Sequence, residues 1–438
     1  MHAPLTREID DVTHYLSRLT LIAAALFGLA AAPASAQRTP QQVAEAALKA
    51  APVFDGHNDV PEQLRDRYRN VIAEFDFNDS SKVPSNGWAE GGMHTDIPRL
   101  RAGKVGGQFW SVYVSASLDE PEAVVAVLEQ IDVMKRVIAR YPRDLAFVTT
   151  ADGAAAAMKQ GRIASLLGME GGNSIGESLA VLRQTYDLGA RYLTLTHSKT
   201  LSWADSATDA PQHDGLTDFG HKVVREMNRL GMLVDISHVS EATMMDVLDE
   251  AKAPVIFSHS GARAVDGHPR NVPDSVLARL PKNGGIVMAV GYPAFLSEDY
   301  RQWSADNAAE TARLNSLYPG DPKAVTDGVA AWVGANPRPK ATVAQWVDHI
   351  DHIRKVAGID HIGLGGDYDG MEIGPEGAED VTGYPALFTE LARRGYSQAD
   401  LEKIASRNVL RVLRGAEAYA GSVKGMAPIE TPAVGTGE

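Results

Sequence analysis

Eight short runs of mostly apolar residues, spread along almost the whole chain, constrain the fold more than any other feature. Most are separated from the next run by a segment of helical character. Strands that alternate with helices predict a parallel sheet, and eight such units are typical of a closed (β/α)8 barrel of the TIM type. The runs are residues 53–60, 106–114, 163–170, 192–197, 232–238, 254–259, 285–291 and 362–369.

The segments between the runs complete this pattern. Residues 62–103 are polar, contain several glycines and have no clear period, so we expect a long loop after the first strand. Residues 296–350 are predicted to be an insertion of helices and loops, with aromatic residues that serve packing. Helices are predicted at about 40–50, 122–140, 176–188, 216–230, 240–252, 383–395 and 398–414.

Most of the eight runs end in a histidine or a carboxylate. His57 and Asp59 are two residues apart, which is the side-chain repeat of a strand, so the two side chains can point the same way. A polar residue at a strand end can simply mark the solvent boundary. In a barrel, however, the carboxyl ends of all strands meet on one rim, where catalytic groups lie. The candidates are His57, Asp59, Glu170, His197, His238, His259 and Asp367.

These residue types indicate a metal site. His238 and His259 are 21 residues apart, which suits one βα unit and predicts equivalent positions on adjacent strands. Imidazole nitrogen and carboxylate oxygen are ordinary zinc ligands. Two zinc ions that share a bridging carboxylate need about five protein ligands, whereas one zinc ion would leave several candidates unused.

Other polar residues carry weaker signals. Asp235, inside the fifth run, could orient a ligand histidine or serve packing, and Asp369 could support the site from behind Asp367. The pair Gly365-Gly366 suggests close approach of the backbone to the site rather than a phosphate loop. Six histidines end no apolar run, and we expect surface or structural roles for them: His94, His213, His221, His268, His352 and His361.

Charge and termini limit the class of protein. A net charge of −14 and a pI near 5.4 argue against a nucleic-acid-binding surface. Residues 19–32 are apolar and are followed by Ala34-Ser35-Ala36, which predicts a signal peptide at 1–36, a catalytic domain at 37–420 and a flexible tail at 421–438. The chain has no cysteine, which excludes disulfides and a cysteine-linked lipid anchor. We expect a soluble, exported protein, most simply periplasmic.

Seven ordered blocks resemble the renal (membrane) dipeptidase family, peptidase family M19. The resemblance covers roughly residues 45–415. The blocks are Asp55-Gly56-His57-Asn58-Asp59, Gly168-Met169-Glu170-Gly171, Leu195-Thr196-His197, Asp235-Ile236-Ser237-His238, Phe257-Ser258-His259-Ser260, Arg270-Asn271-Val272-Pro273-Asp274 and Gly365-Gly366-Asp367-Tyr368-Asp369-Gly370.

The resemblance implies a centre of two zinc ions and a bridging hydroxide as the nucleophile. In it, His57 and Asp59 would bind one zinc, His238 and His259 the other, and Glu170 would bridge both.

The resemblance also implies roles around the substrate. Asp367 would be the acid/base carboxylate, and His197 would hold the scissile carbonyl oxygen. Arg270 would pair with the terminal carboxylate of the substrate, a task that suits a planar guanidinium. Tyr292 would lie near the same carboxylate.

The predicted function is therefore a zinc dipeptidase that cleaves L-Xaa-L-Xaa and L-Xaa-D-Xaa dipeptides, with a family-like homodimer as the expected assembly. One alternative is an amidohydrolase-type lactonase, phosphotriesterase or deaminase. Many of these use a carbamylated lysine from the fourth strand, whereas the fourth run here ends in His197. A metal-stabilised binding protein is a further alternative, but it would be expected to have lost ligands.

Overall fold

The computed structural model describes residues 1, 38–85 and 92–432. The chain divides into two units, Met1–Thr39 and Pro40–Glu438, and the fold belongs to the second. Apart from Met1, the predicted signal peptide lies outside the described residues, as do residues 433–438 of the predicted tail. Within the described ranges, no helix has the length and apolar character needed to span a membrane.

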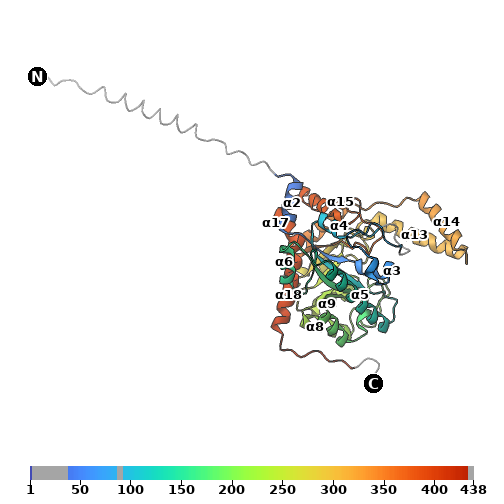
Figure 1. Cartoon of the computed structure of the whole chain (residues 1–438), viewed down its shortest axis with the longest axis horizontal. Coiled ribbons are helices and arrows are strands. Elements are labelled where there is room, and N and C mark those ends of the chain that lie inside the picture. The colour runs from blue at the N-terminus through green and yellow to red at the C-terminus, as the bar shows by residue number, and fades with distance from the viewer. Residues whose placement is uncertain (2–37, 86–91, 433–438) are drawn as a thin grey trace. The chain divides into compact units, whose positions relative to one another are not determined.

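Eight parallel strands close into a barrel, as predicted, and helices surround it (Figure 1). Each of the eight apolar runs overlaps one strand, and the ring closes through the pairing of β9 with β1. The strands are β1 (Val53–Asn58), β2 (Val105–Tyr113), β4 (Ile163–Glu170), β5 (Ala190–Thr194), β6 (Leu233–Asp235), β7 (Ile256–Ser260), β8 (Ile286–Val290) and β9 (Ile362–Gly365). The short β3 (Leu145–Phe147), which was not predicted, pairs with the beginning of β4.

The predicted helices lie close to their expected positions, and local capping explains several of their ends. Ser178 caps α7 by accepting a hydrogen bond from the Val181 amide, and Gly189 and Gly231 end α7 and α8 in the left-handed conformation. These helices are α2 (Pro40–Ala50), α5 (Glu120–Arg140), α7 (Leu179–Leu188), α8 (Asp218–Leu230), α9 (Glu241–Glu250), α16 (Tyr384–Arg393), α17 (Gln398–Glu402) and α18 (Asn408–Ser422). The short helices α10 (Asp274–Leu277) and α11 (Leu280–Asn283) precede β8.

The prediction of a long loop at 62–103 was wrong. This stretch contains α3 (Val60–Tyr68), a 3-10 turn (Ile72–Glu74) and α4 (Ile97–Ala102). The inner face of α3 includes two polar residues, Gln63 and Arg67, which are buried and joined by a 2.6 Å hydrogen bond. A helix that buries polar side chains gives little apolar periodicity, which hid it in the sequence. The alanine-rich α6 (Ala151–Lys159) was missed as well.

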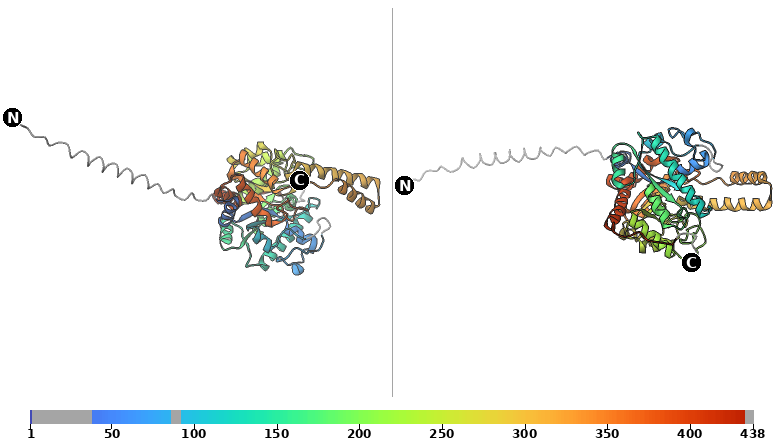
Figure 2. Two further views of the ribbon diagram at one scale, coloured as in Figure 1. Left: turned by 90° about the horizontal axis from the view of Figure 1, so that it is seen from above. Right: turned by 60° about the horizontal axis from the view of Figure 1, so that its bottom comes forward.

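The insertion between β8 and β9 contains α12 (Pro293–Leu296), α13 (Glu298–Leu317), α14 (Pro322–Ala335) and α15 (Val343–Val356). The pair α13 and α14 extends away from the barrel (Figure 2). Trp303 and Trp332 hold its base together, with ring centroids 5.8 Å apart, and Trp303 donates to the Asn336 carbonyl. Trp346 of α15 is fully buried and donates to the Ala289 carbonyl of β8, so α15 is part of the barrel wall.

The last described residues also contact the barrel unit. The Ile429 amide donates to Glu226 of α8, and its carbonyl accepts from Arg183 of α7. Backbone contacts of this kind fix the chain beyond α18 to two helices.

Candidate active site

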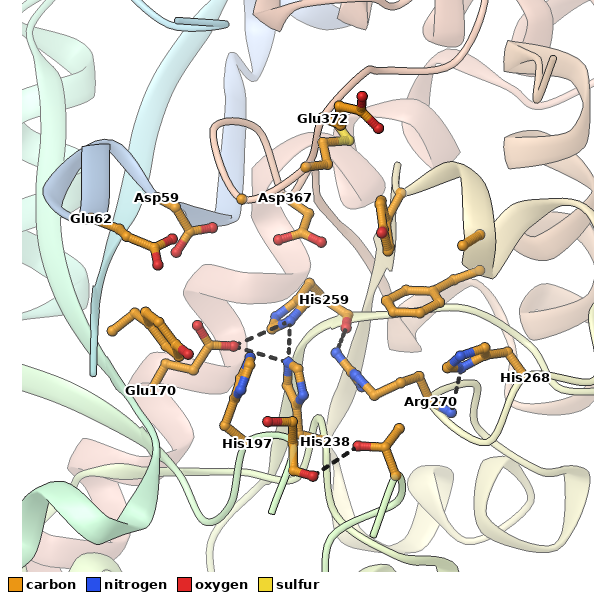
Figure 3. Close-up of a pocket in the computed structure, with 18 residues that line it drawn as sticks. Asp59, Glu62, Glu170, His197, His238, His259, His268, Arg270, Asp367 and Glu372 are labelled. Atoms are coloured by element: carbon orange, nitrogen blue, oxygen red, sulfur yellow. Dashed lines mark hydrogen bonds and ion pairs between the residues drawn. The ribbon is translucent and has the colours of Figure 1, made fainter. Parts of the chain in front are cut away.

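The predicted site residues come together in a pocket of about 680 Å³ at the carboxyl ends of the strands (Figure 3). Most are placed by a strand or by the one to three residues that follow it, as expected for a barrel, and Arg270 lies in the loop between β7 and α10. His57, within β1, is almost fully buried behind the pocket wall. The other eight predicted residues line the pocket: Asp59, Glu170, His197, His238, His259, Arg270, Tyr292 and Asp367.

Glu170 lies between two groups of ligand atoms. Its Oε2 is 3.3 Å from His57 Nε2, which is itself 3.4 Å from Asp59 Oδ2. Its Oε1 is 3.0 Å from His238 Nε2 and 3.4 Å from His259 Nε2. One carboxylate therefore faces two different sets of donors with its two oxygens.

Hydrogen bonds behind two histidines determine which ring nitrogen faces the pocket. The Tyr192 hydroxyl is 2.9 Å from His57 Nδ1 and 3.3 Å from the Gly56 carbonyl oxygen, to which it donates. The hydroxyl therefore accepts the Nδ1 proton of His57 and leaves the Nε2 lone pair free.

His259 has an equivalent support. Its Nδ1 is 2.8 Å from Ser258 Oγ, and that hydroxyl donates to Asp235 at 2.6 Å. Asp235 also accepts from Thr194 and from two backbone amides, so it is held firmly. Asp235 thus orients His259 through Ser258, and Nε2 of His259 is left to face Glu170.

The electrostatics of the cluster suit a cation. Burial lowers the pKa of His238 and His259 well below the usual value, so both rings are neutral. Burial alone would raise the pKa of Glu170, but His57 and His238 bring it well below the usual range. Burial alone would lower the pKa of His57, but the net shift is well above the usual value because of the nearby Tyr192, Glu170 and Asp59. A bound cation would take the place of the His57 proton between the two carboxylates.

The donor set also fits a metal by its geometry. Three groups of side chains each offer ligand atoms that lie within 4.8 Å of one another. Neutral imidazoles and ionised carboxylates with converging lone pairs are the ligands that zinc prefers. The groups are His57 with His259 and Asp367, Glu170 with His197 and His238, and His57 with Asp59 and Glu170.

The rim of the pocket has a strained backbone. His238, Asp367 and Asp369 have φ of 66°, 63° and 69°, the left-handed region that residues other than glycine rarely adopt. Gly370 follows, and a side chain there would collide with Asp59. These turns direct His238 and Asp367 into the pocket from the chain that leaves β6 and β9.

Asp367 lies 4.0 Å from His57 Nε2, and burial raises its pKa well above the usual value. Asp369 faces away from this group, because its carboxylate accepts from the His94 amide at 2.7 Å.

Arg270 and its neighbours form the other side of the pocket. Arg270 is 1% exposed and donates to the His259 carbonyl and to Ser260 Oγ. Its guanidinium lies over the Phe295 ring, 5.3 Å from the centroid. Burial lowers its pKa to about 10, so it keeps its charge at neutral pH. Tyr292, at the beginning of α12, lines the same side, and burial raises its pKa to about 12.

Several pocket residues were not predicted from the sequence. His268 was expected to be structural or on the surface, but it lines the pocket and accepts a hydrogen bond from the Arg270 amide. Glu62, Tyr113 and Phe295 also line it. Glu62 is one helical turn beyond Asp59, and that spacing was the one signal for it.

The remaining five unassigned histidines have structural contacts. These contacts are His94 with Asp369, His213 with Leu201, His221 with Glu250, His352 with Asp274 and His361 with Gly285.

Comparisons with known proteins identify the family of the chain. A family model described as membrane dipeptidase (peptidase family M19) matches residues 41–426. The probable dipeptidase PvdM from Pseudomonas aeruginosa shares 23% identity, with a TM-score of 0.73 over 87% of this chain and 99% of that one. A dipeptidase AC of family M19 shares 26% identity, with a TM-score of 0.66 over 84% of this chain and 98% of that one.

A metallopeptidase from Rhodobacter sphaeroides, solved with a phosphinate mimic of L-Ala-D-Ala, shares 25% identity, with a TM-score of 0.66 over 84% of this chain and 99% of that one. The match of the family model to most of the chain, together with groups of side chains that could hold a metal ion, establishes the class of protein. The chain belongs to the membrane dipeptidase family, peptidase family M19, and is a metallo-dipeptidase.

Proposed function

We propose that the enzyme binds two zinc ions and hydrolyses the peptide bond of dipeptides. His57 and Asp59 would hold one ion, His238 and His259 the other, and Glu170 both. The observation that carries this proposal is the position of Glu170, whose two oxygens face the two sets of donors separately. A single ion would leave one of these sets without a cation.

When bound, the two ions would supply Lewis-acid polarisation of the scissile carbonyl and a water molecule of lowered pKa. Asp367 would accept a proton from the attacking water and deliver it to the nitrogen of the leaving amine. Its raised pKa suits a group that holds a proton between these two transfers.

His197 and Arg270 would position the substrate. Burial lowers the pKa of His197, so a neutral ring can contact the carbonyl oxygen without placing a second positive charge beside Arg270. Arg270 would bind the terminal carboxylate, and Tyr292, on the same side of the pocket, would contact it too.

The proposed substrates are L-Xaa-L-Xaa and L-Xaa-D-Xaa dipeptides. The complex of the Rhodobacter sphaeroides relative with an L-Ala-D-Ala mimic supports the second class. The apolar segment at 19–32 and the Ala34-Ser35-Ala36 that follows it support export to a periplasm, where such peptides would be met. We also propose a homodimer, as in the family, and the division into signal peptide, barrel and tail given above.

The test combines metal analysis with assays of free amino acid release. Protein loaded with zinc should contain two ions per chain and should hydrolyse L-Ala-L-Ala and L-Ala-D-Ala, and a chelator should abolish both activities. Hydrolysis of lactones or phosphotriesters by loaded protein that cleaves no dipeptide would contradict the proposal. One ion per fully active chain would contradict the role of Glu170.

A further inference from the structure

Glu62 is a pocket carboxylate that the proposed mechanism does not use. It lies in the first turn of α3, one turn after Asp59, and lines the pocket (Figure 3). In Figure 3, Glu62 and Asp59 are on one side of the histidine cluster, and Arg270 and His268 are on the other. Two carboxyl groups therefore lie on one side of the pocket, and a guanidinium group lies on the other.

The other carboxylates that line the pocket have partners. Asp59 and Glu170 face His57, Asp367 lies 4.0 Å from it, and Glu372 forms an ion pair with Arg338 at 3.0 Å. Across the described ranges, Glu62 has neither an ion pair nor a hydrogen bond from a side chain. Among the carboxylates that line the pocket, Glu62 is therefore the one without a cationic partner in the part of the chain that the structure describes.

The surroundings of Glu62 favour a cation from outside the chain. Burial and then Asp59, Asp66 and Glu170 raise its pKa, so a positive charge placed beside it would relieve the repulsion between these groups. The amide groups at the beginning of α3 favour negative charge at this position. Asp59 and Glu170 would be occupied by the proposed metal ions, whereas Glu62 would remain available.

A dipeptide bound as proposed would extend toward Glu62. With its terminal carboxylate at Arg270 and its scissile carbonyl at the histidine cluster, its first residue would lie on the opposite side from Arg270. Tyr113 lines the pocket as well, with its ring centroid 4.7 Å from that of His197, and offers an apolar face for a methylene chain.

We propose that Glu62 determines specificity by binding a positively charged side chain on the first residue of the substrate, so that the enzyme prefers lysyl and arginyl dipeptides. This inference rests on the proposed function, because it assumes the same orientation of the dipeptide. The matching ligand chemistry is an ammonium or guanidinium group at the end of a flexible apolar stem.

The experiment compares L-Lys-L-Ala with L-norleucyl-L-Ala, whose side chain has nearly the same length and no charge. For the wild-type enzyme, kcat/KM should be higher for the lysyl substrate. In Glu62→Gln, the ratio of the two kcat/KM values should fall roughly tenfold, because the amide keeps the size of the side chain and loses its charge. Glu74→Gln is the control: Glu74 is an exposed carboxylate in the 3-10 turn that follows α3, and the ratio should stay as in the wild type.

Three results would overturn the inference. An unchanged ratio in Glu62→Gln would remove Glu62 from specificity. An equal loss for both substrates would assign it to the α-ammonium group that all dipeptides share. Loss of zinc from Glu62→Gln, measured by metal analysis, would make it a metal ligand.

If the proposed function itself is wrong, the outcome differs from these three results, because zinc-loaded wild-type protein would then cleave neither dipeptide. Calorimetric titration with the same two dipeptides still decides the inference in that case. Tighter binding of L-Lys-L-Ala that disappears in Glu62→Gln would support it, and equal binding of both dipeptides by the wild type would contradict it.

Discussion

At the scale of single residues, the site depends on side chains that touch no substrate. Tyr192 fixes the ring of His57, so Tyr192→Phe should weaken metal binding about 10- to 100-fold, the usual cost of losing a partner behind a metal ligand. Competition with a fluorescent chelator measures this affinity. The matched control is Tyr419→Phe on α18, which should bind metal as the wild type does. Unchanged affinity in Tyr192→Phe would show that the barrel alone orients His57.

Asp367 gives a second prediction at this scale. Asp367→Asn should keep its metal and lose kcat by roughly 10²- to 10⁴-fold, the range expected for removal of an acid/base group. Steady-state kinetics together with metal analysis checks both parts. Asp369→Asn should cost much less turnover, because that carboxylate accepts a backbone hydrogen bond and faces away from His57. Full activity in metal-replete Asp367→Asn would exclude this role.

The residues at the strand ends could be predicted from the sequence, because the carboxyl end of every barrel strand lies at the rim of the pocket. His57, Glu170 and His259 are examples, each within a strand. His268 and Glu62 were missed because a loop and a helix place them, and neither leaves a periodic signal. Their positions follow from tertiary packing, which one sequence does not display.

At the scale of elements, a network of charges joins α15 to α16. Arg394 donates to Asp348, Asp351 and Glu390, and Arg393 also pairs with Glu390. The hydrogen bond from Arg393 lowers the pKa of Glu390 to about 2, below its usual value of 4.5. A lowered carboxylate pKa stabilises the fold above about pH 4.5, and this contribution is lost as the pH falls toward 2.

Glu390→Gln should therefore be less stable than the wild type by roughly 1–2 kcal/mol at neutral pH, with the difference shrinking below about pH 4.5. Urea unfolding at a series of pH values measures it. Glu376→Gln, which removes an exposed partner of Lys340, is the control and should cost much less stability than Glu390→Gln. A deficit for Glu390→Gln that is equal at pH 7 and pH 3 would contradict the ionic explanation.

Strands and helices whose buried faces are apolar were predicted correctly, and helices without a clear apolar face were missed. All eight barrel strands were predicted from apolar runs of sequence. A barrel strand is covered on both faces, so it has a nearly continuous run of apolar residues. The helix α3 escaped because Gln63 and Arg67 make up part of its buried face, and α6 because a run of alanines has little amphipathic contrast.

At the scale of the whole molecule, the proposed metal centre should link stability to metal. Its ligands come from strands distributed around the barrel, so a bound ion holds elements that are far apart in the sequence. Free zinc at 100 times its dissociation constant should stabilise the fold by about 2.7 kcal/mol, and a chelator should remove this increment. Thermal unfolding with EDTA and after readdition of zinc tests it, and equal midpoints would contradict the prediction.

The left-handed residues at the pocket rim have a consequence for engineering. Each such position costs of order 1–3 kcal/mol, and glycine would relieve it at His238 or Asp367. Selection for heat resistance alone would favour those replacements, and each would delete a group proposed to bind metal or transfer protons. Thermostable variants of this enzyme should therefore be sought in the helices and the outer insertion, with these two turns kept as they are.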